Sequence, residues 1–102
     1  AHNVEVNSGT AIAGCTVLAG SVTIGKNCQI GGMTAINGHM SVCDGVIITG
    51  MSMVTKSITE PGIYSSGMPH TTNKEWRKSI AHLRNLSDMK SRLKALEALA
   101  KS

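Results

Sequence analysis

A branched aliphatic residue recurs at every sixth position through the first half of the chain. The series is unbroken over nine hexads: Val6, Ile12, Leu18, Ile24, Ile30, Ile36, Val42, Ile48 and Val54. An α-helix repeats every 3.6 residues and an isolated strand every 2, so neither returns to one phase after six. The six-residue period therefore predicts short strands along the flat sides of a prism.

Two further classes of residue follow the same period. Small or β-branched residues stand two places before most of the aliphatics: Thr10, Thr16, Val22, Cys28, Thr34, Val46 and Ser52. Glycine or asparagine, which can adopt the positive φ expected of sharp corners, recurs near the turns: Asn7, Gly9, Gly14, Gly20, Gly25, Gly31, Gly32 and Gly38. The pattern predicts a parallel β-helix of hexapeptide type, with about three coils of roughly 18 residues and the aliphatics stacked inward.

The repeat also predicts the organisation of the chain. We expect the β-helix over residues 1–59, a loop that leaves it over 60–71, and a C-terminal α-helical extension over 72–102. The chain opens without Met and with the repeat already running, and an open solenoid end leaves backbone groups unpaired. We therefore expect further coils before Ala1.

The C-terminal segment has the pattern of one amphipathic helix. Thr72 followed by Glu75 resembles a capping box. The apolar stripe consists of Leu83, Leu86, Met89, Leu93, Leu96 and Leu99. Its spacing favours packing within an oligomer, and without about 18 consecutive apolar residues we expect no stable membrane insertion.

Positive charge is concentrated in this segment. From Lys74 onward eight basic residues stand against three acidic ones, whereas the chain as a whole carries +4. A solvated face and an acidic protein partner are both compatible with this charge. Nucleic acid has little support, because aromatic residues are not interleaved with the basic ones.

Two of the four histidines are candidates for chemistry. His2 and His39 are 37 residues apart, two coils plus one position, so both should lie on one corner of the prism. Two strand spacings separate them by about 10 Å. A neutral imidazole can accept a proton, so a catalytic role and a surface role are both open. His70 and His82 fall in the expected exit loop and helix, which favours surface positions.

Metal and disulfide sites have weaker support. Asp44 lies in the region where a further ligand would have to stand, and no other His, Cys or carboxylate falls at a matching corner, so we expect no metal. Cys15, Cys28 and Cys43 are odd in number and lack CxxC spacing, which favours free thiols.

Five segments carry a more specific resemblance than the hexads do. They are Ala1-His2-Asn3-Val4, Ile36-Asn37-Gly38-His39, Thr49-Gly50-Met51-Ser52-Met53-Val54, Glu60-Pro61-Gly62-Ile63-Tyr64-Ser65-Ser66-Gly67-Met68-Pro69 and Asn73-Lys74-Glu75-Trp76-Arg77-Lys78. In this order they closely resemble the UDP-3-O-acylglucosamine N-acyltransferase family over almost the whole chain.

The resemblance implies a cytoplasmic homotrimer of left-handed β-helices in a Gram-negative bacterium. It implies an enzyme of lipid A biosynthesis that moves a 3-hydroxyacyl chain from acyl carrier protein to the 2-amine of UDP-3-O-acyl-glucosamine. The acyl carrier protein thioester is then a co-substrate, and no cofactor is expected. The basic helical segment becomes a surface for the acidic carrier protein.

The same resemblance assigns roles to individual residues. His2 matches the general base, His39 a second, supporting histidine, and Met53 the groove for pantetheine and the acyl chain. Transfer is expected to be direct, without an acyl-enzyme. This family recognises uridine through an N-terminal domain and earlier coils, which these residues do not include. His2 alone is therefore not expected to make the chain active by itself.

Two other classes of protein stay open beside this one. Another hexapeptide acyltransferase would transfer an O-acyl or acetyl group from coenzyme A. A non-catalytic trimeric solenoid would tolerate replacement of His2. The acyl-chain length is not predicted.

Overall fold

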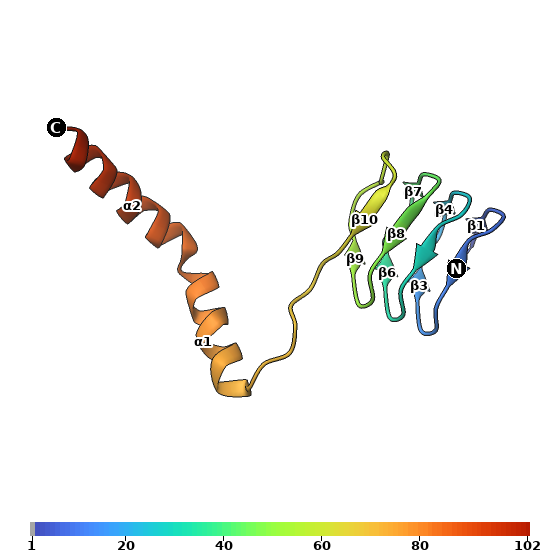
Figure 1. The fold of residues 1–102 in the computed structure, drawn as a ribbon, viewed down its shortest axis with the longest axis horizontal. Helices are drawn as coiled ribbons and strands as arrows, with labels where there is room; N and C mark the ends of the chain where they lie inside the picture. Colours follow the sequence, from blue (N-terminus) through green and yellow to red (C-terminus); the bar gives the residue numbers. More distant parts are fainter. Residues whose placement is uncertain (1) are drawn as a thin grey trace. The chain divides into compact units, whose positions relative to one another are not determined.

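The computed structural model describes residues 2–102. The chain forms two compact units, Ala1–Met68 and Pro69–Ser102 (Figure 1). The first unit is a β-solenoid and the second consists of helices.

The solenoid strands are short and follow the hexads. They are β1 (Glu5–Val6), β2 (Ala11–Ile12), β3 (Val17–Leu18), β4 (Thr23–Ile24), β5 (Gln29–Ile30), β6 (Ala35–Ile36), β7 (Ser41–Val42), β8 (Val46–Ile48), β9 (Met53–Val54) and β10 (Gly62–Tyr64). Strands β1 to β9 each end on one of the repeated aliphatics, which is why the period of six appears in the sequence.

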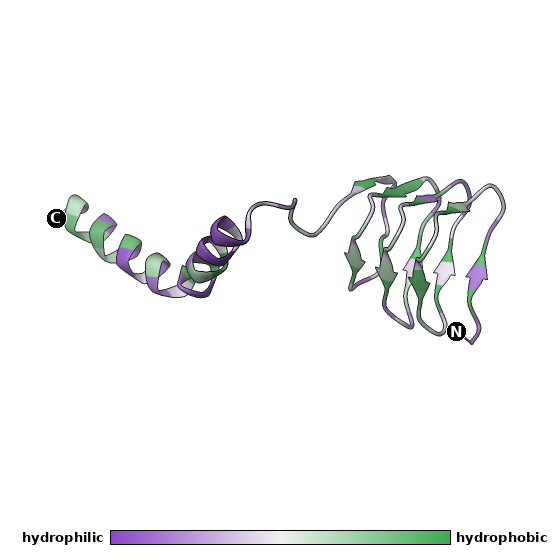
Figure 2. Ribbon diagram, turned by 90° about the horizontal axis from the view of Figure 1, so that it is seen from below, coloured by the Kyte–Doolittle hydropathy of each residue, from purple (hydrophilic) through white to green (hydrophobic). Residues whose placement is uncertain are grey.

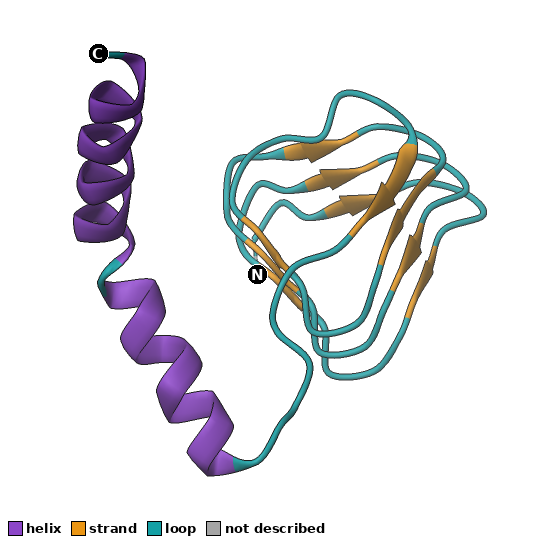
Figure 3. Cartoon of the chain, turned by 60° about the vertical axis from the view of Figure 1, so that its left-hand side comes forward, coloured by secondary structure: helices purple, strands orange, loops and turns teal. Residues whose placement is uncertain are grey.

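The strands form three parallel sheets, one on each side of a prism (Figure 3). Their orders are β1-β4-β7, β10-β8-β5-β2 and β3-β6-β9. Glu5 pairs with Thr23 and Thr23 with Ser41, so one coil takes 18 residues. Backbone hydrogen bonds join successive coils, as where the Glu5 N–H donates to the Val22 carbonyl at 2.9 Å. The predicted parallel β-helix of about three coils is confirmed.

The predicted inward column is also confirmed. Buried aliphatics from successive coils form the core: Ile24, Ile30, Ile36, Val42, Ile48 and Val54. The small residues two places earlier are buried with them: Val22, Cys28, Thr34, Val46 and Ser52. Figure 2 shows the apolar colour recurring along the strands. In the first coil, Val6 and Ile12 remain 43% and 38% exposed, because only the second coil packs against them here.

The corners differ from the sequence prediction. A positive φ does recur at every sixth residue: Asn3, Gly9, Cys15, Ser21, Asn27, Met33, His39, Gly45 and Met51. Most of these residues are not glycine. Of the glycines and asparagines predicted to have positive φ, only Gly9 does. Gly25, Gly31 and Gly38 are required for a different reason, close approach of the coils; a Cβ on Gly25, for instance, would lie 2.6 Å from the Asp44 nitrogen.

The last coil is shorter than the others. Ile58 pairs with Val42, and Gly62 with Val46, so the register across this coil is 16 residues. The strand β10 of this coil lies within the segment 60–71, which was expected to be a loop. The shortened coil narrows the end of the prism at the turn after β9.

The second unit contains two helices in place of the single predicted one. Helix α1 spans Asn73–Arg84 and α2 spans Leu86–Lys101. Thr72 is the N-cap of α1, and its hydroxyl accepts the Glu75 N–H at 3.3 Å. The break falls at Asn85, whose side-chain N–H donates to the Ala81 carbonyl at 3.0 Å; a short amide that bonds to a nearby carbonyl competes with helix continuation. Within residues 2–102, no helix is long and apolar enough to cross a membrane.

Candidate active site at a corner of the solenoid

The structure places His2 and His39 on the same corner of the prism. The Ser21 N–H donates to the His2 carbonyl at 2.8 Å, and the His39 N–H donates to the Gly20 carbonyl at 3.0 Å. One coil, at Gly20 and Ser21, thus lies between the two histidines. Both side chains are exposed. Two strand spacings put their backbones about 10 Å apart, as expected from the sequence.

Glycines occupy the positions that stack on His2 in the next two coils, Gly20 and Gly38. A Cβ on Gly20 would contact the His2 carbonyl oxygen at 3.4 Å, and one on Gly38 would lie 2.9 Å from the Gly20 carbonyl oxygen. The contact at Gly20 would be an ordinary one, whereas position 38 favours a residue without a side chain. Of the three stacked residues His2, Gly20 and Gly38, only His2 carries a side chain. The sequence analysis did not predict this role of glycine, although the spacing of 18 from His2 to Gly20 and on to Gly38 indicates it.

An apolar side of the prism leads to the histidine corner. On the sheet β3-β6-β9, Val17, Ala35 and Met53 stand in register on neighbouring strands. Val17 is 62% and Met53 64% exposed. His39 follows Ala35 by four residues, so the chain turns from this side directly into the corner. A hydrocarbon chain could lie along this side with its head group at the histidines.

Asp44 does not belong to the histidine corner. Its carboxylate accepts the Lys26 N–H at 2.7 Å on a neighbouring corner, where it joins two coils. Within the described part of the chain, no group of three or more His, Cys, Asp or Glu side chains is arranged to hold a metal ion. The three cysteines are free; Cys15 is exposed, Cys28 buried and Cys43 half-buried.

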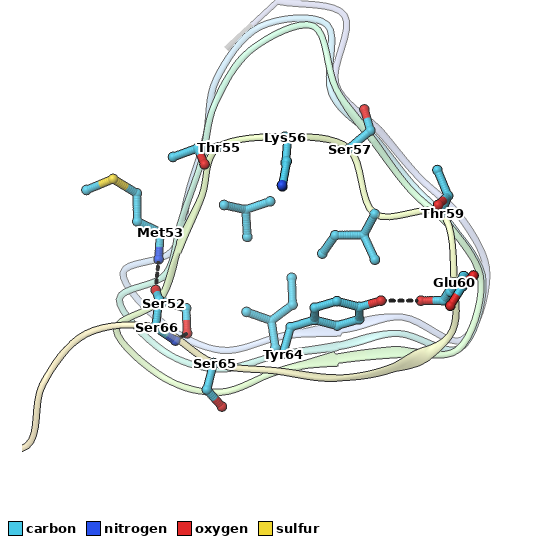
Figure 4. Close-up of a pocket in the computed structure, with 13 residues that line it drawn as sticks. Ser52, Met53, Thr55, Lys56, Ser57, Thr59, Glu60, Tyr64, Ser65 and Ser66 are labelled. Atoms are coloured by element: carbon cyan, nitrogen blue, oxygen red, sulfur yellow. Dashed lines mark hydrogen bonds between the residues drawn. The ribbon is translucent and has the colours of Figure 1, made fainter. Parts of the chain in front are cut away.

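A separate cavity of about 340 Å³ lies at the narrowed end of the prism (Figure 4). Ile48, Val54 and Ile58 contribute apolar surface to it, and serine and threonine hydroxyls from residues 52–66 line it as well. The Tyr64 ring lies along one side of the prism and points toward Glu60, and its hydroxyl donates to the Glu60 carbonyl at 2.8 Å. This cavity depends on the short last coil, which the sequence pattern did not reveal.

Comparison with known proteins identifies the family. No family model matches the chain. Over 101 residues the chain is 95% identical to the UDP-3-O-acylglucosamine N-acyltransferase of Pseudoalteromonas translucida (strain TAC 125). The chain belongs to the UDP-3-O-acylglucosamine N-acyltransferase family. The resemblance seen in the sequence is thereby confirmed.

More distant members of the UDP-3-O-acylglucosamine N-acyltransferase family match the same stretch. The enzymes of three Coxiella burnetii strains, Dugway 5J108-111, RSA 331 / Henzerling II and CbuG_Q212, are each 54% identical over 99 residues. These matches cover 97% of this chain but 29% of each Coxiella enzyme, and the match to the Pseudoalteromonas enzyme covers 99% of this chain and 30% of that enzyme. The chain thus spans less than a third of the length of the curated relatives.

Proposed function

We propose that this chain forms the catalytic corner of an N-acyltransferase of lipid A biosynthesis. In the proposed reaction a 3-hydroxyacyl chain moves from acyl carrier protein to the 2-amine of UDP-3-O-acyl-glucosamine. The observation that carries the proposal is 95% identity over 101 residues to a UDP-3-O-acylglucosamine N-acyltransferase. The exposed histidine corner beside an apolar side of the prism supports it, because the reaction needs a base and a surface for a hydrocarbon chain.

His2 acts as the general base in this proposal. The amine nitrogen attacks the thioester carbonyl, and the His2 imidazole takes a proton from that nitrogen as the C–N bond forms. The tetrahedral intermediate then collapses, the C–S bond breaks, and the His2 imidazolium returns its proton to the departing thiolate. An amide and a free carrier thiol result. Gly20 and Gly38, which stack on His2, place no side chain in the way of the sugar amine.

His39 and Met53 have supporting roles. His39 lies two coils from His2 on the same corner, a position from which its imidazole hydrogen-bonds to substrate or stabilises developing charge. Met53 contributes exposed apolar surface for the acyl and pantetheine chain. Direct transfer is the simplest course, since a deprotonated amine is already a capable nucleophile.

The assembly is part of the same proposal. We place the enzyme in the cytoplasm as a homotrimer, in which the exposed apolar side of one prism faces a neighbouring prism. The relatives are more than three times as long as the matched segment, so their additional length is available for uridine recognition. For the tests below we define the extended protein as a protein of the relatives' full length that carries residues 1–102.

The decisive test of the proposed function is acyl transfer with two donors. The extended protein is offered UDP-3-O-acyl-glucosamine with a 3-hydroxyacyl thioester of either acyl carrier protein or coenzyme A, and the product is analysed by mass spectrometry. We expect an amide on the 2-amine and a higher kcat/KM with the carrier protein. A preference for coenzyme A indicates another hexapeptide acyltransferase, and no transfer with either donor indicates a non-catalytic solenoid.

The basic surface of α1 predicts a salt-dependent KM for the carrier protein. Lys74, Arg77 and Lys78 line one recess at the start of this helix. Exposed opposite charges attract less strongly at high ionic strength, so raising the salt from about 50 to about 300 mM should raise this KM at least about threefold. A Lys74→Ala/Arg77→Ala variant should reduce the salt dependence, whereas Lys26→Ala on the solenoid should not. A KM that does not change with salt contradicts docking at this surface.

A further inference from the structure

Ser66 takes the place of a missing strand at the edge of one sheet. In the sheet β3-β6-β9 the last strand is β9, and the next coil does not continue it. The Met53 N–H, at this edge, donates to the Ser66 hydroxyl oxygen at 2.7 Å, and the Ser66 N–H donates to the Ser52 hydroxyl oxygen at 3.2 Å (Figure 4). Ser66 thus forms hydrogen bonds with two successive residues of the chain at β9.

The partner of Ser66 is itself fixed in the core. The Ser52 side chain is only 4% exposed, and its hydroxyl donates to the Thr49 carbonyl at 2.7 Å. Ser52 therefore connects Ser66 to the rigid interior of the last coil. The neighbouring Ser65 is attached differently: its hydroxyl accepts from the Thr49 hydroxyl at 2.7 Å and makes no hydrogen bond with Met53. Two adjacent serines thus make comparable bonds to different parts of the coil.

The Met53 side chain lies on the far side of this arrangement. Figure 4 shows it outside the ribbon and directed away from the cavity, while its backbone nitrogen faces Ser66. Along its other edge, toward the preceding coil, β9 pairs with β6 through Ala35 and Met53. A two-residue strand held on one side only would move easily at its free edge. The bond to Ser66 holds the second side of β9, and so it fixes where the Met53 thioether lies.

We propose that Ser66 is a positioning residue for the acyl chain. It holds the backbone of Met53 at the edge of β9 and so fixes the position of the Met53 side chain. That side chain contacts the end of the donor's hydrocarbon chain, so its position determines how long a chain is accommodated. This inference rests on the proposed function, because it requires that an acyl chain lies on the side of the prism that carries Met53. It adds a residue in the exit segment, outside both the histidine corner and the hexads.

The test compares Ser66→Ala with Ser65→Ala and Ser66→Thr in the extended protein. We measure kcat/KM for two carrier-protein thioesters whose 3-hydroxyacyl chains differ by two methylenes. Ser66→Ala should change the ratio of the two values by about fivefold, since one methylene in a hydrophobic pocket is worth tenfold or more. Ser65→Ala should leave the ratio within about twofold at a similar loss of stability, and Ser66→Thr, which keeps the hydroxyl, should restore it.

Amide hydrogen exchange provides a readout that does not depend on activity. The Met53 amide should exchange about tenfold faster in Ser66→Ala and at the unchanged rate in Ser65→Ala. If the unsubstituted protein transfers acyl groups and Ser66→Ala changes neither the ratio nor the exchange rate, this inference is wrong and the proposed function stands. If the unsubstituted protein transfers nothing, the proposed function fails and this inference fails with it.

Discussion

Replacement of His2 by alanine is expected to lower kcat of the extended protein by about 10²- to 10⁴-fold, the usual contribution of a positioned general base. The amine can then lose its proton only to water or buffer. The KM values should change little, because in the proposed binding mode the hydrocarbon chain contacts Met53 and the carrier protein contacts α1. The free energy of unfolding should stay within about 0.5 kcal/mol, since the His2 side chain is exposed. Steady-state kinetics and denaturant unfolding measure both quantities.

His70→Ala is the matched control for this variant. His70 is also exposed and lies in the segment before α1, outside the solenoid unit. Its replacement should leave kcat within about twofold, the range of an ordinary surface substitution. If His2→Ala keeps the unsubstituted rate while folded, His2 is a structural residue and the base must be sought elsewhere.

Replacement of Gly25 by alanine is expected to destabilise the solenoid by about 3 kcal/mol, at the upper end for overpacking. Gly25 is buried where two coils approach closely. A Cβ there would lie 2.6 Å from both the Asp44 nitrogen and the Cys43 carbonyl carbon, and these backbone atoms cannot rotate away as a side chain could. A loss of this size corresponds to a fall in Tm of more than about 10 °C.

Gly14→Ala provides the control. No heavy atom lies within 4 Å of a Cβ built at Gly14, and its φ is not positive. Removing the flexibility of glycine from the unfolded chain should make this variant neutral or about 0.5 kcal/mol more stable. Equal losses of stability in the two variants would mean that contact between coils is not what requires glycine at position 25.

Much of the fold can be predicted from the hexads because one physical requirement repeats in every coil. Each strand must place one aliphatic in a narrow interior, so residues such as Ile24, Ile30 and Ile36 keep one phase and are buried as expected. The turns could not be predicted in the same way. The positive φ falls one residue after the glycine, at Ser21 and His39 among others, and hydrogen bonds between the coils hold these residues there.

The short last coil and the break between the helices depend on local contacts that do not repeat along the sequence. The last coil is shortened at the turn before Ile58, and β10 then pairs two residues out of the earlier register. The break between α1 and α2 depends on the Asn85 side chain, whereas the apolar stripe continues through it. Neither feature interrupts the hydrophobic pattern, so the sequence predicted a loop and a continuous helix.

The sequence predicted that the two candidate histidines share a corner, but it did not predict the contacts around them. Counting residues was sufficient to put His2 and His39 on one corner, because the coil length is constant up to that point. Contacts between residues that are distant in sequence explain the stacked glycines at Gly20 and Gly38. They also explain the hydrogen bond between Ser66 and β9. The roles of His2, His39 and Met53 in catalysis remain predictions.

We propose that acyl transfer takes place at the histidine corner. A crystal structure of the extended protein with UDP-3-O-acyl-glucosamine and an unreactive donor analogue, in which a thioether replaces the thioester, tests it most directly. We predict that the 2-amine nitrogen lies within about 3.2 Å of a His2 ring nitrogen, the reach of a general base, with the hydrocarbon chain against Met53. A substrate amine bound at another corner, out of reach of His2, would contradict the account.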